Sequence, residues 1–436
     1  MSSEWRTQKL GDIFELINGY AFKGSEFQNS GVPVFKIKNV KPNQILLDDL
    51  AYVAEEVAKK RPDKQVLRGD ILITMSGNRM DGSKDTWVGK VAYFDLPGRY
   101  LLNQRVGILR PRSGVQVDRK CCAYFLSSED YQHFFISVAT SSGGQANLSP
   151  SQILNEEFRL PAIDEQEKIS ALLGALDDRI ALLHETSATL EAIAQALFKS
   201  WFIDFDPVRA KSEGRAPESM DEATAALLPD GFEESELGLV PKEWRVQSLD
   251  TIATFLNGLA LQKFPPTGID DLPVIKIAQL RKGDTVGADQ ASRDIKPEYI
   301  VKNGDVLFSW SGSLEVEIWC GGEGALNQHL FKVTSADFPK WFYFFWTRHH
   351  LADFRQTAAS KATTMGHIQR GHLTAAKVCI PNKEAMKAAT SILGPIVEKL
   401  IANSLQARTL TNIRDSLLPK LISGKLVLSQ ESSVAS

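Results

Sequence analysis

WRTQKLGDIFELINGYAF at residues 5–22 and WRVQSLDTIATFLNGLAL at residues 244–261 are two copies of one pattern, and they decide the fold. Three more pairs of blocks follow in the same order: VPVFKIKNV at 32–40 with LPVIKIAQL at 272–280, GDILITMSG at 69–77 with GDVLFSWSG at 304–312, and LNQR at 102–105 with LNQH at 326–329. The offset between the copies changes in steps, as insertions and deletions in loops produce. Such collinear matches indicate a duplicated module.

Each module is expected to be a mixed α/β (α+β) domain. Its short apolar runs that follow Gly-Asp are typical of strands entered from a turn, whereas the aromatic stretches 120–138 and 340–356 are expected to be helical. We place the first module at 1–160 and the second at 237–381.

A heptad pattern follows each module, at 161–205 and at 382–425. Steps of four and three residues are typical of a long helix with one apolar seam. Asp164 with Glu167 suggests a capping box at the start of the first helix, and Gly424 suggests the end of the second. The seam of the first helix includes Ile169, Leu173, Leu176, Ile180, Leu190, Leu197 and Trp201, and that of the second includes Leu393, Ile396, Leu400, Leu410, Leu417 and Leu421. Asn403 and Arg414 interrupt the second seam.

An apolar seam has to be buried. Antiparallel pairing of the two helices is favoured, and it predicts a rod of about 55 Å at about 1.5 Å per residue, with the two modules in a pseudo-two-fold arrangement. The alternatives are that each helix packs on its own module or drives homodimerisation. Residues 206–236 are acidic and rich in Pro, Gly and Ala, so they are expected to form an exposed linker, and 426–436 a tail.

Charge is segregated along the chain. Residues 1–155 carry 20 Lys and Arg against 16 Asp and Glu, a net of +4, whereas 204–236 carry 3 against 10, a net of −7. A mildly basic module is compatible with a phosphate backbone as partner, but it is also an ordinary protein surface. With no apolar span and no secretory pattern at the N-terminus, a cytoplasmic protein is expected, in which Cys121, Cys122, Cys320 and Cys379 are reduced thiols.

Motifs for catalysis are missing from the sequence. It has no phosphate-binding G-x-x-x-x-G-K-[ST], no glycine-rich strand-turn-helix for S-adenosylmethionine and no cluster with metal-ligand spacing. Asp118-Arg119-Lys120 resembles the end of a nuclease motif, but no Pro-Asp stands nearby. These absences favour a binding role without metal or cofactor in this chain.

Four stretches resemble the specificity subunit of type I restriction–modification enzymes: LPAIDEQEKISALLGALDDRI at 160–180, LFKSWFIDFDPV at 197–208, LGLVPKEWRVQSL at 237–249 and LLPKLISGKL at 417–426. The resemblance implies two target-recognition domains separated by two long antiparallel coiled-coil helices. It implies double-stranded DNA as ligand and two methyltransferase subunits docked on the helices. It also implies that restriction (motor and nuclease) subunits join them, and S-adenosylmethionine, ATP and Mg²⁺ are expected on those partner subunits. The second helix departs from this pattern, because it has no Glu-Gln pair like the one at 165–166 in the first helix. Equivalent binding of partners by the two helices is therefore in question.

The candidate DNA-binding residues fall into two groups. Polar residues common to both copies suit the fold or phosphate contacts, which carry no sequence information; they are Lys36, Ser76, Asn103 and Gln104, with Lys276, Ser311, Asn327 and Gln328. Residues that differ suit base reading, because Arg and Lys fit guanine and Asn and Gln fit adenine. They are Lys38, Asn39, Asn78, Arg79, Arg105, Ser141, Gln145 and Asn147, with Gln279, Arg281, Lys282, Ser313, His329, Lys361, Thr364, His367 and Arg370. For each of them a solvated or structural role is the alternative.

Two diverged modules on a rod predict a split, asymmetric DNA target with an unread spacer, as dimer geometry sets half-site spacing elsewhere. Three other functions stay open at this point. They are an enzyme with an unrecognised active site, a coiled-coil scaffold that binds no DNA, and a specificity subunit that serves a fused nuclease–methyltransferase.

Overall fold

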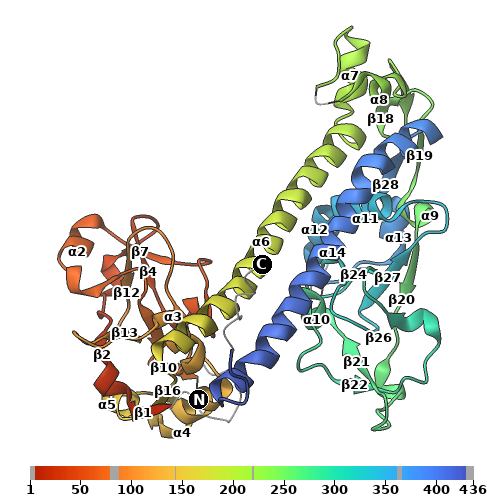
Figure 1. Cartoon of the computed structure of the whole chain (residues 1–436). Helices are drawn as coiled ribbons and strands as arrows, with labels where there is room; N and C mark the ends of the chain where they lie inside the picture. The colour runs from red at the N-terminus through yellow and green to blue at the C-terminus, as the bar shows by residue number, and fades with distance from the viewer. Residues whose placement is uncertain (1–4, 79–87, 143, 219, 361–365, 429–436) are drawn as a thin grey trace, which may run out of the picture. The chain divides into compact units, whose positions relative to one another are not determined.

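The computed structural model describes residues 5–78, 88–142, 144–218, 220–360 and 366–428. The chain divides into two compact units: residues 1–178 with 410–436 form unit 1, and residues 179–409 form unit 2. Each unit holds one module, and two long helices, α6 (Ile163–Phe202) and α14 (Lys383–Ile422), contribute to both units (Figure 1). None of the described helices is both long and apolar enough to span a membrane.

Two sheets form the body of the first module, with strand orders β11-β9-β13-β2 and β3-β7-β4-β12-β8. The first sheet is antiparallel, whereas β4 and β12 pair in parallel in the second. The strands are β2 (Phe14–Asn18), β3 (Phe27–Gln28), β4 (Val32–Phe35), β7 (Ala51–Val53), β8 (Gln65–Val66), β9 (Ile71–Thr74), β11 (Val91–Tyr93), β12 (Tyr100–Leu102) and β13 (Val106–Pro111).

The second module repeats both sheets, with the orders β25-β24-β27-β20 and β22-β21-β26-β23. Its one parallel pair among these strands, β21 with β26, matches β4 with β12. The strands are β20 (Thr254–Asn257), β21 (Leu272–Ile275), β22 (Gln290–Ala291), β23 (Ile300–Val301), β24 (Val306–Ser309), β25 (Val316–Ile318), β26 (Gly324–Leu326) and β27 (Leu330–Thr334). The repeat predicted from the sequence is therefore confirmed, although β3 of the first module has no counterpart in the matching sheet of the second.

A two-stranded sheet joins the beginning of each module to its end. In the first module β1 (Arg6–Lys9) pairs with β16 (Glu157–Leu160), and in the second β19 (Arg245–Ser248) pairs with β28 (Lys377–Ile380). Short helices follow the same correspondence: α1 (Leu10–Ile13) and α5 (Pro150–Leu154) match α9 (Leu249–Ile252) and α13 (Arg370–Ala375).

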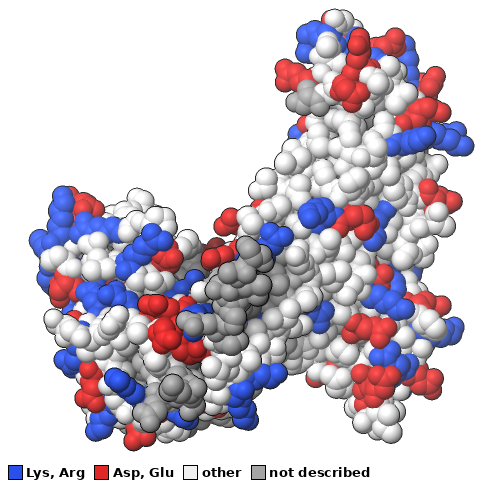
Figure 2. All heavy atoms as spheres, viewed as in Figure 1, with Lys and Arg blue, Asp and Glu red and all other residues white. Residues whose placement is uncertain are grey.

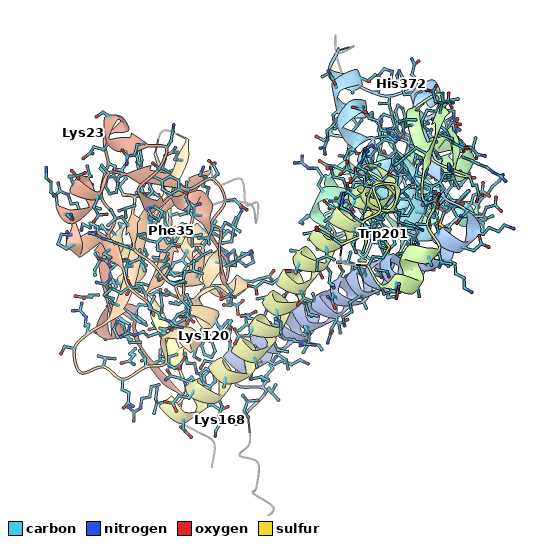
Figure 3. All side chains as sticks on the ribbon, turned by 90° about the horizontal axis from the view of Figure 1, so that it is seen from above. Lys23, Phe35, Lys120, Lys168, Trp201 and His372 are labelled. Carbon is cyan, nitrogen blue, oxygen red and sulfur yellow. The ribbon has the colours of Figure 1, made fainter. Side chains whose placement is uncertain are left out.

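The aromatic stretches are helical, as predicted, but each is divided in two. They form α3 (Arg119–Leu126) with α4 (Glu129–Val138), and α11 (Lys340–His349) with α12 (Leu351–Ser360). Every residue from Trp341 to Trp346 is buried, so this run packs a core. In the first module Phe35 lies inside, with its ring stacked 4.8 Å from that of Tyr100 (Figure 3). Charged side chains of both signs are interspersed on the surface (Figure 2).

Helices α6 and α14 pack together and also on the modules. In unit 1 the core of the first module includes Leu173 from α6 and Leu421 from α14. In unit 2 the core of the second module includes Phe198 from α6 and Leu393 from α14. Two of the arrangements considered from the sequence, helix-to-helix packing and packing on a module, therefore occur together.

Two polar contacts mark the antiparallel course of the helices. In unit 1 the Arg414 Nη1 donates to the Asp177 Oδ1 at 2.8 Å, and in unit 2 the Asn403 Nδ2 donates to the Ser187 Oγ at 3.2 Å. The residue number rises along α6 as it falls along α14. Both polar interruptions of the second seam thus meet polar partners on the first helix. Helix α14 ends as expected, with Gly424 in the left-handed region at φ 68°.

Residues 206–236 differ from the exposed linker expected from their composition. They contain α7 (Asp206–Ser212), α8 (Glu222–Ala226) and β17 (Phe232–Ser235), which pairs with β18 (Gly238–Pro241). Val208 and Leu228 are buried in the core of unit 2. The average composition hid these apolar residues, and their burial is what folds the segment.

Candidate functional site

The same three segments converge in each module. They are the turn after β9 or β24, the turn before β13 or β27, and the stretch that precedes α5 or α13. In the first module the Met75 N–H donates to the Arg105 carbonyl at 2.8 Å, and the Leu148 N–H donates to the Met75 carbonyl at 2.8 Å.

In the second module the Trp310 N–H donates to the His329 carbonyl at 3.3 Å, and the Ile368 N–H donates to the Trp310 carbonyl at 3.0 Å. One backbone arrangement thus presents different side chains in the two copies.

The first cluster consists of Ser76, Arg105 and Asn147. Strand β10 (Ser76–Asn78) pairs with β15 (Gln145–Asn147), so that Ser76 lies opposite Asn147. The Arg105 Nη1 donates to the Asn147 Oδ1 at 3.0 Å. Ser76 is buried, whereas Arg105 is exposed. A guanidinium is therefore held at the surface by a neighbouring amide.

The second cluster consists of Trp310, Ser311, His329 and His367. Ser311 and His367 form an isolated antiparallel bridge at the place of Ser76 and Asn147. The Ser311 Oγ and the His329 Nδ1 are 2.9 Å apart and share a hydrogen bond. The Trp310 ring lies 6.1 Å from that of His329 and 6.3 Å from that of His367. Two imidazoles and an indole thus replace a guanidinium, an amide and a thioether.

Our sequence reasoning missed Trp310. The signal was its place in the matched blocks, where it stands opposite Met75 in an otherwise similar stretch. The indole Nε1 donates to the Asn257 Oδ1 at 3.0 Å, which fixes the ring over the cluster.

The shared Asn-Gln turns have a structural role. Asn103 forms an isolated parallel bridge with Tyr20, the residue after Gly19, and Asn327 forms one with Leu259, the residue after Gly258. A Cβ atom on Gly19 would lie 2.0 Å from the Asn103 carbonyl oxygen, and one on Gly258 would lie 2.2 Å from that of Asn327. Only glycine permits this close approach. Gln104 is exposed next to Arg105, and Gln328 is half-buried next to His329.

Several other candidates are engaged within the fold. Asn39 is fully buried, and its Oδ1 accepts the Lys36 N–H at 2.9 Å. The Gln279 Oε1 accepts the Lys276 N–H at 3.3 Å in the same way. These amides cap short helices, so we leave both out of the proposed base-reading set.

The candidate lysines near β4 and β21 already have partners within the protein. Lys36 Nζ lies 4.2 Å from the centre of the Phe27 ring, Lys38 pairs with Asp49, and Lys276 pairs with Asp289. Lys282 lies 3.4 Å from Asp284.

The remaining candidates lie around the clusters or outside the described residues. Ser141, Gln145, Arg281, Ser313 and Arg370 are exposed. The Arg370 Nη2 also donates to the Phe255 carbonyl at 3.4 Å. Arg79, Lys361 and Thr364 lie outside the described residues, as does the side chain of Asn78.

The seam residues are used within the chain. Ile169, Leu173, Leu393 and Leu421 are at most 1% exposed, and Trp201 is 6% exposed. The other seam residues, which lie on the helices expected to hold the partner subunits, are partly buried: Leu176, Ile180, Leu190, Leu197, Ile396, Leu400, Leu410 and Leu417. The apolar side chains that the helices expose are instead Leu182, Ile193 and Ile413. A partner docked on the helices would contact these before the seam.

Glu165 and Gln166 also act inside unit 1. The Gln166 Oε1 accepts the Asp118 N–H at 3.0 Å, and the Glu165 Oε1 accepts the Leu428 N–H at 2.9 Å. Glu165 and Gln166 therefore hold parts of unit 1 together. The second helix has no such pair, so among the described residues unit 2 has no equivalent of these two contacts from its helix α14.

No group of three or more His, Cys, Asp or Glu side chains is gathered for a metal ion among the described residues. Burial raises the pKa of the Cys121 and Cys122 thiols, and it raises the pKa of Cys379 to about 12, so these thiols stay protonated.

A family model for the type I restriction modification DNA specificity domain matches residues 2–192 and 241–408, one segment for each module with part of the long helix that follows it. The chain belongs to this family. It is similar to the HindI specificity subunit of Haemophilus influenzae, at 23% identity over 97% of this chain and 100% of the relative. It is also similar to the MjaIX specificity subunit of Methanocaldococcus jannaschii, at 24% identity over 97% and 94%.

The fold has a counterpart among solved structures. The type I restriction–modification S subunit from M. genitalium superposes with a TM-score of 0.53 at 16% identity, over 96% of both chains. The chain is thus the DNA specificity subunit of a type I restriction–modification system, which is the non-catalytic component of such an enzyme. This assignment decides against the scaffold that binds no DNA.

Proposed function

We propose that this specificity subunit reads a split, asymmetric DNA target, one half-site with each module. The observation that carries the proposal is the pair of clusters, in which one backbone arrangement presents Arg105 and Asn147 in the first module and His329 and His367 in the second. Arg and Asn are side chains that read guanine and adenine edges. Different side chains on the same arrangement should select different bases.

The subunit itself performs no chemistry in this proposal. Two methyltransferase subunits dock on α6 and α14, with S-adenosylmethionine bound to them, and restriction subunits add ATP- and Mg²⁺-dependent cleavage. The exposed Leu182, Ile193 and Ile413 give such partners apolar contacts on the helices. Because the substrate is DNA, the complex is expected to act in the cytoplasm of its host.

Two single variants test the half-site assignment. Arg105→Ala should relax the preference at one position of one half-site by about 1–3 kcal/mol and leave the other half-site unchanged. His329→Ala should relax the other half-site. The measurement is the set of methylated sequences produced in cells that also express the methyltransferase subunit.

Arg6→Ala and Arg245→Ala are matched controls, because both are exposed arginines at equivalent places on β1 and β19. They should leave the methylated motif unchanged. If Arg105→Ala relaxes both half-sites, or neither, the assignment of one cluster to one half-site is wrong.

A further inference from the structure

One matched segment of the two modules differs sharply in charge. Residues 59–68 (KKRPDKQVLR) carry five Lys and Arg against one Asp, a net of +4. Residues 294–303 (DIKPEYIVKN) carry two basic and two acidic residues, a net of zero. Both segments form a short 3-10 helix, Pro62–Lys64 or Pro297–Tyr299, followed by β8 or β23. The fold is conserved here while the charge is not.

The basic segment lies beside the turn that carries Arg105. Strand β8 pairs antiparallel with β12, with Val66 opposite Tyr100 and Gln65 opposite Leu101. The pairing therefore places residues 59–64 at the end of β12, where the 103–105 turn begins. Tyr20 lies at the same edge, because it forms a parallel bridge with Asn103.

Arg61 is held in place at this edge by neutral partners. Its guanidinium lies 4.2 Å from the centre of the Tyr20 ring, and its Nη2 donates to the Tyr20 Oη at 2.9 Å. Its Nη1 donates to the Lys60 carbonyl at 3.0 Å. Asp63, the acid within the segment, lies 3.1 Å from Lys64. The positive charge of Arg61 is thus oriented without being neutralised by an ion pair among the described residues.

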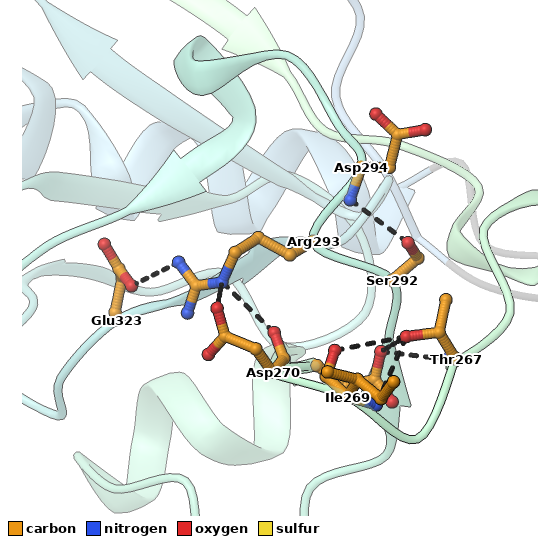
Figure 4. A network of polar contacts seen from close by, with 8 residues as sticks. Thr267, Ile269, Asp270, Ser292, Arg293, Asp294 and Glu323 are labelled. Atoms are coloured by element: carbon orange, nitrogen blue, oxygen red, sulfur yellow. Dashed lines mark hydrogen bonds and ion pairs between the residues drawn. The ribbon is translucent and has the colours of Figure 1, made fainter.

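The arginine nearest this place in the second module is neutralised. The Arg293 Nε lies 2.8 Å from the Asp270 Oδ2, and its Nη1 donates to the Glu323 Oε2 at 2.7 Å (Figure 4). The residue at the position of Tyr20 is Leu259, which offers neither a hydroxyl nor a ring face. The second module therefore lacks the ring and hydroxyl that orient Arg61, and it has a lysine, Lys296, at the position of Arg61.

Lys59 and Lys60 extend the basic edge. Both are exposed, and they stand at the end of α2 (Glu55–Lys59) and just after it. Lys and Arg side chains gather over α2 in the surface view (Figure 2). Ammonium and guanidinium groups along one edge can neutralise phosphates of a DNA backbone, and such contacts position a protein without reading bases.

We infer that Lys59, Lys60 and Arg61 form a DNA-phosphate clamp that the first module has and the second lacks, so that the first module supplies most of the electrostatic grip on the target. The inference rests on the proposed DNA-reading function. It assigns the clamp to affinity alone, and the choice of bases to the clusters.

The test is the salt dependence of duplex binding by the full chain together with its methyltransferase subunit. Each lost phosphate contact lowers the slope of log K against log salt concentration by about 0.9. Lys59→Gln/Lys60→Gln should therefore lower the slope by about 1.8, two contacts at that value. The matched control is Lys296→Gln/Lys302→Gln, two exposed lysines of the equivalent segment, and it should leave the slope unchanged.

A second variant, Tyr20→Phe, removes the hydroxyl that orients Arg61 while keeping the ring, and it should weaken duplex binding without altering the methylated motif. Equal slopes for the two double variants would overturn the clamp. A changed motif in Lys59→Gln/Lys60→Gln would also overturn it, because phosphate contacts carry no base information. Failure of the proposed function is a separate outcome, in which the unaltered complex shows no salt-dependent DNA binding.

Discussion

The hydrogen bonds of Asp177 with Arg414 and Tyr124 lead to a prediction about the stability of unit 1. The second unit provides the comparison, because it has apolar residues at the equivalent places. The Asp177 Oδ1 accepts from Arg414 at 2.8 Å, and its Oδ2 accepts from the Tyr124 hydroxyl at 2.5 Å. These bonds join α6, α14 and α3 within unit 1. At the equivalent places unit 2 has Val397 and Ala194, which are at most 1% exposed. One copy thus uses an ion pair where the other uses apolar packing.

The expected cost of breaking the pair follows from its burial. Removal of one partner from a fully buried pair costs about 3–5 kcal/mol. Because the side chains of Arg414 and Asp177 are 23% and 25% exposed, solvent screening reduces that figure. We expect about 2 kcal/mol for Asp177→Val, which leaves the Tyr124 hydroxyl without its acceptor and the guanidinium with Asp415 as its remaining acidic partner. Arg414→Ala should cost about 1 kcal/mol, because Asp177 keeps Tyr124 as a donor.

The double variant Asp177→Val/Arg414→Ala copies the apolar pair of unit 2. It should cost at least 1 kcal/mol less than the sum of the single variants, since contacting residues couple by about 0.5–3 kcal/mol. Hydrogen exchange read by mass spectrometry measures the opening free energy of peptides from α3 and α6, and so resolves unit 1 from unit 2. Additive costs, or no cost for Asp177→Val, would refute the reasoning.

Three further predictions concern particular contacts. Asp70→Ala should destabilise the first module by about 3 kcal/mol in urea unfolding, since Asp70 is 1% exposed and accepts two bonds from Arg110 at 2.7 and 2.8 Å; a change under 1 kcal/mol would contradict this. Burial lowers the pKa of His350 to about 4, and its neutral ring donates to the Lys377 carbonyl at 2.9 Å. Below about pH 6.5 the unfolded chain therefore binds a proton at this histidine, whereas the folded chain does not. As the pH falls from about 6.5 to about 4, the free energy of unfolding should decrease by up to about 1 kcal/mol per pH unit, and His350→Gln should make this decrease smaller. Deleting one heptad from 173–197 and one from 393–417 should shorten the unread spacer or abolish methylation, and an unchanged spacer would refute a ruler role for the helices.

The sequence alone predicted the parts of the fold that are repeated or periodic. The matched blocks predicted equivalent modules, and the heptads predicted two helices that pack together, because both signals recur many times along the chain. The prediction from the sequence was wrong where the burial of a few residues determines the structure. Val208 and Leu228 fold the acidic segment 206–236, although its average composition is typical of a linker.

In the candidate site, too, the sequence predicted some residues correctly and misjudged others. Comparison of the copies selected Arg105, Asn147, His329 and His367, and the structure brings them together as two equivalent clusters. Asn39 passed the same comparison, but it is buried as a helix cap, and burial depends on side-chain packing that sequence matching does not contain. Trp310 was missed, although it stands opposite Met75 in the matched blocks. The base that each residue reads stays a prediction.

The measurement that tests the central claim most directly is a genome-wide map of N6-methyladenine, made with the methyltransferase subunit and either this chain or a chimera. In the chimera, residues 1–155 are replaced by the first module of another family member. We predict one split, asymmetric motif that appears only when the chain is present, and a chimera motif in which one half-site changes while the other half-site and the spacer stay the same. A motif that changes in both half-sites would contradict the account.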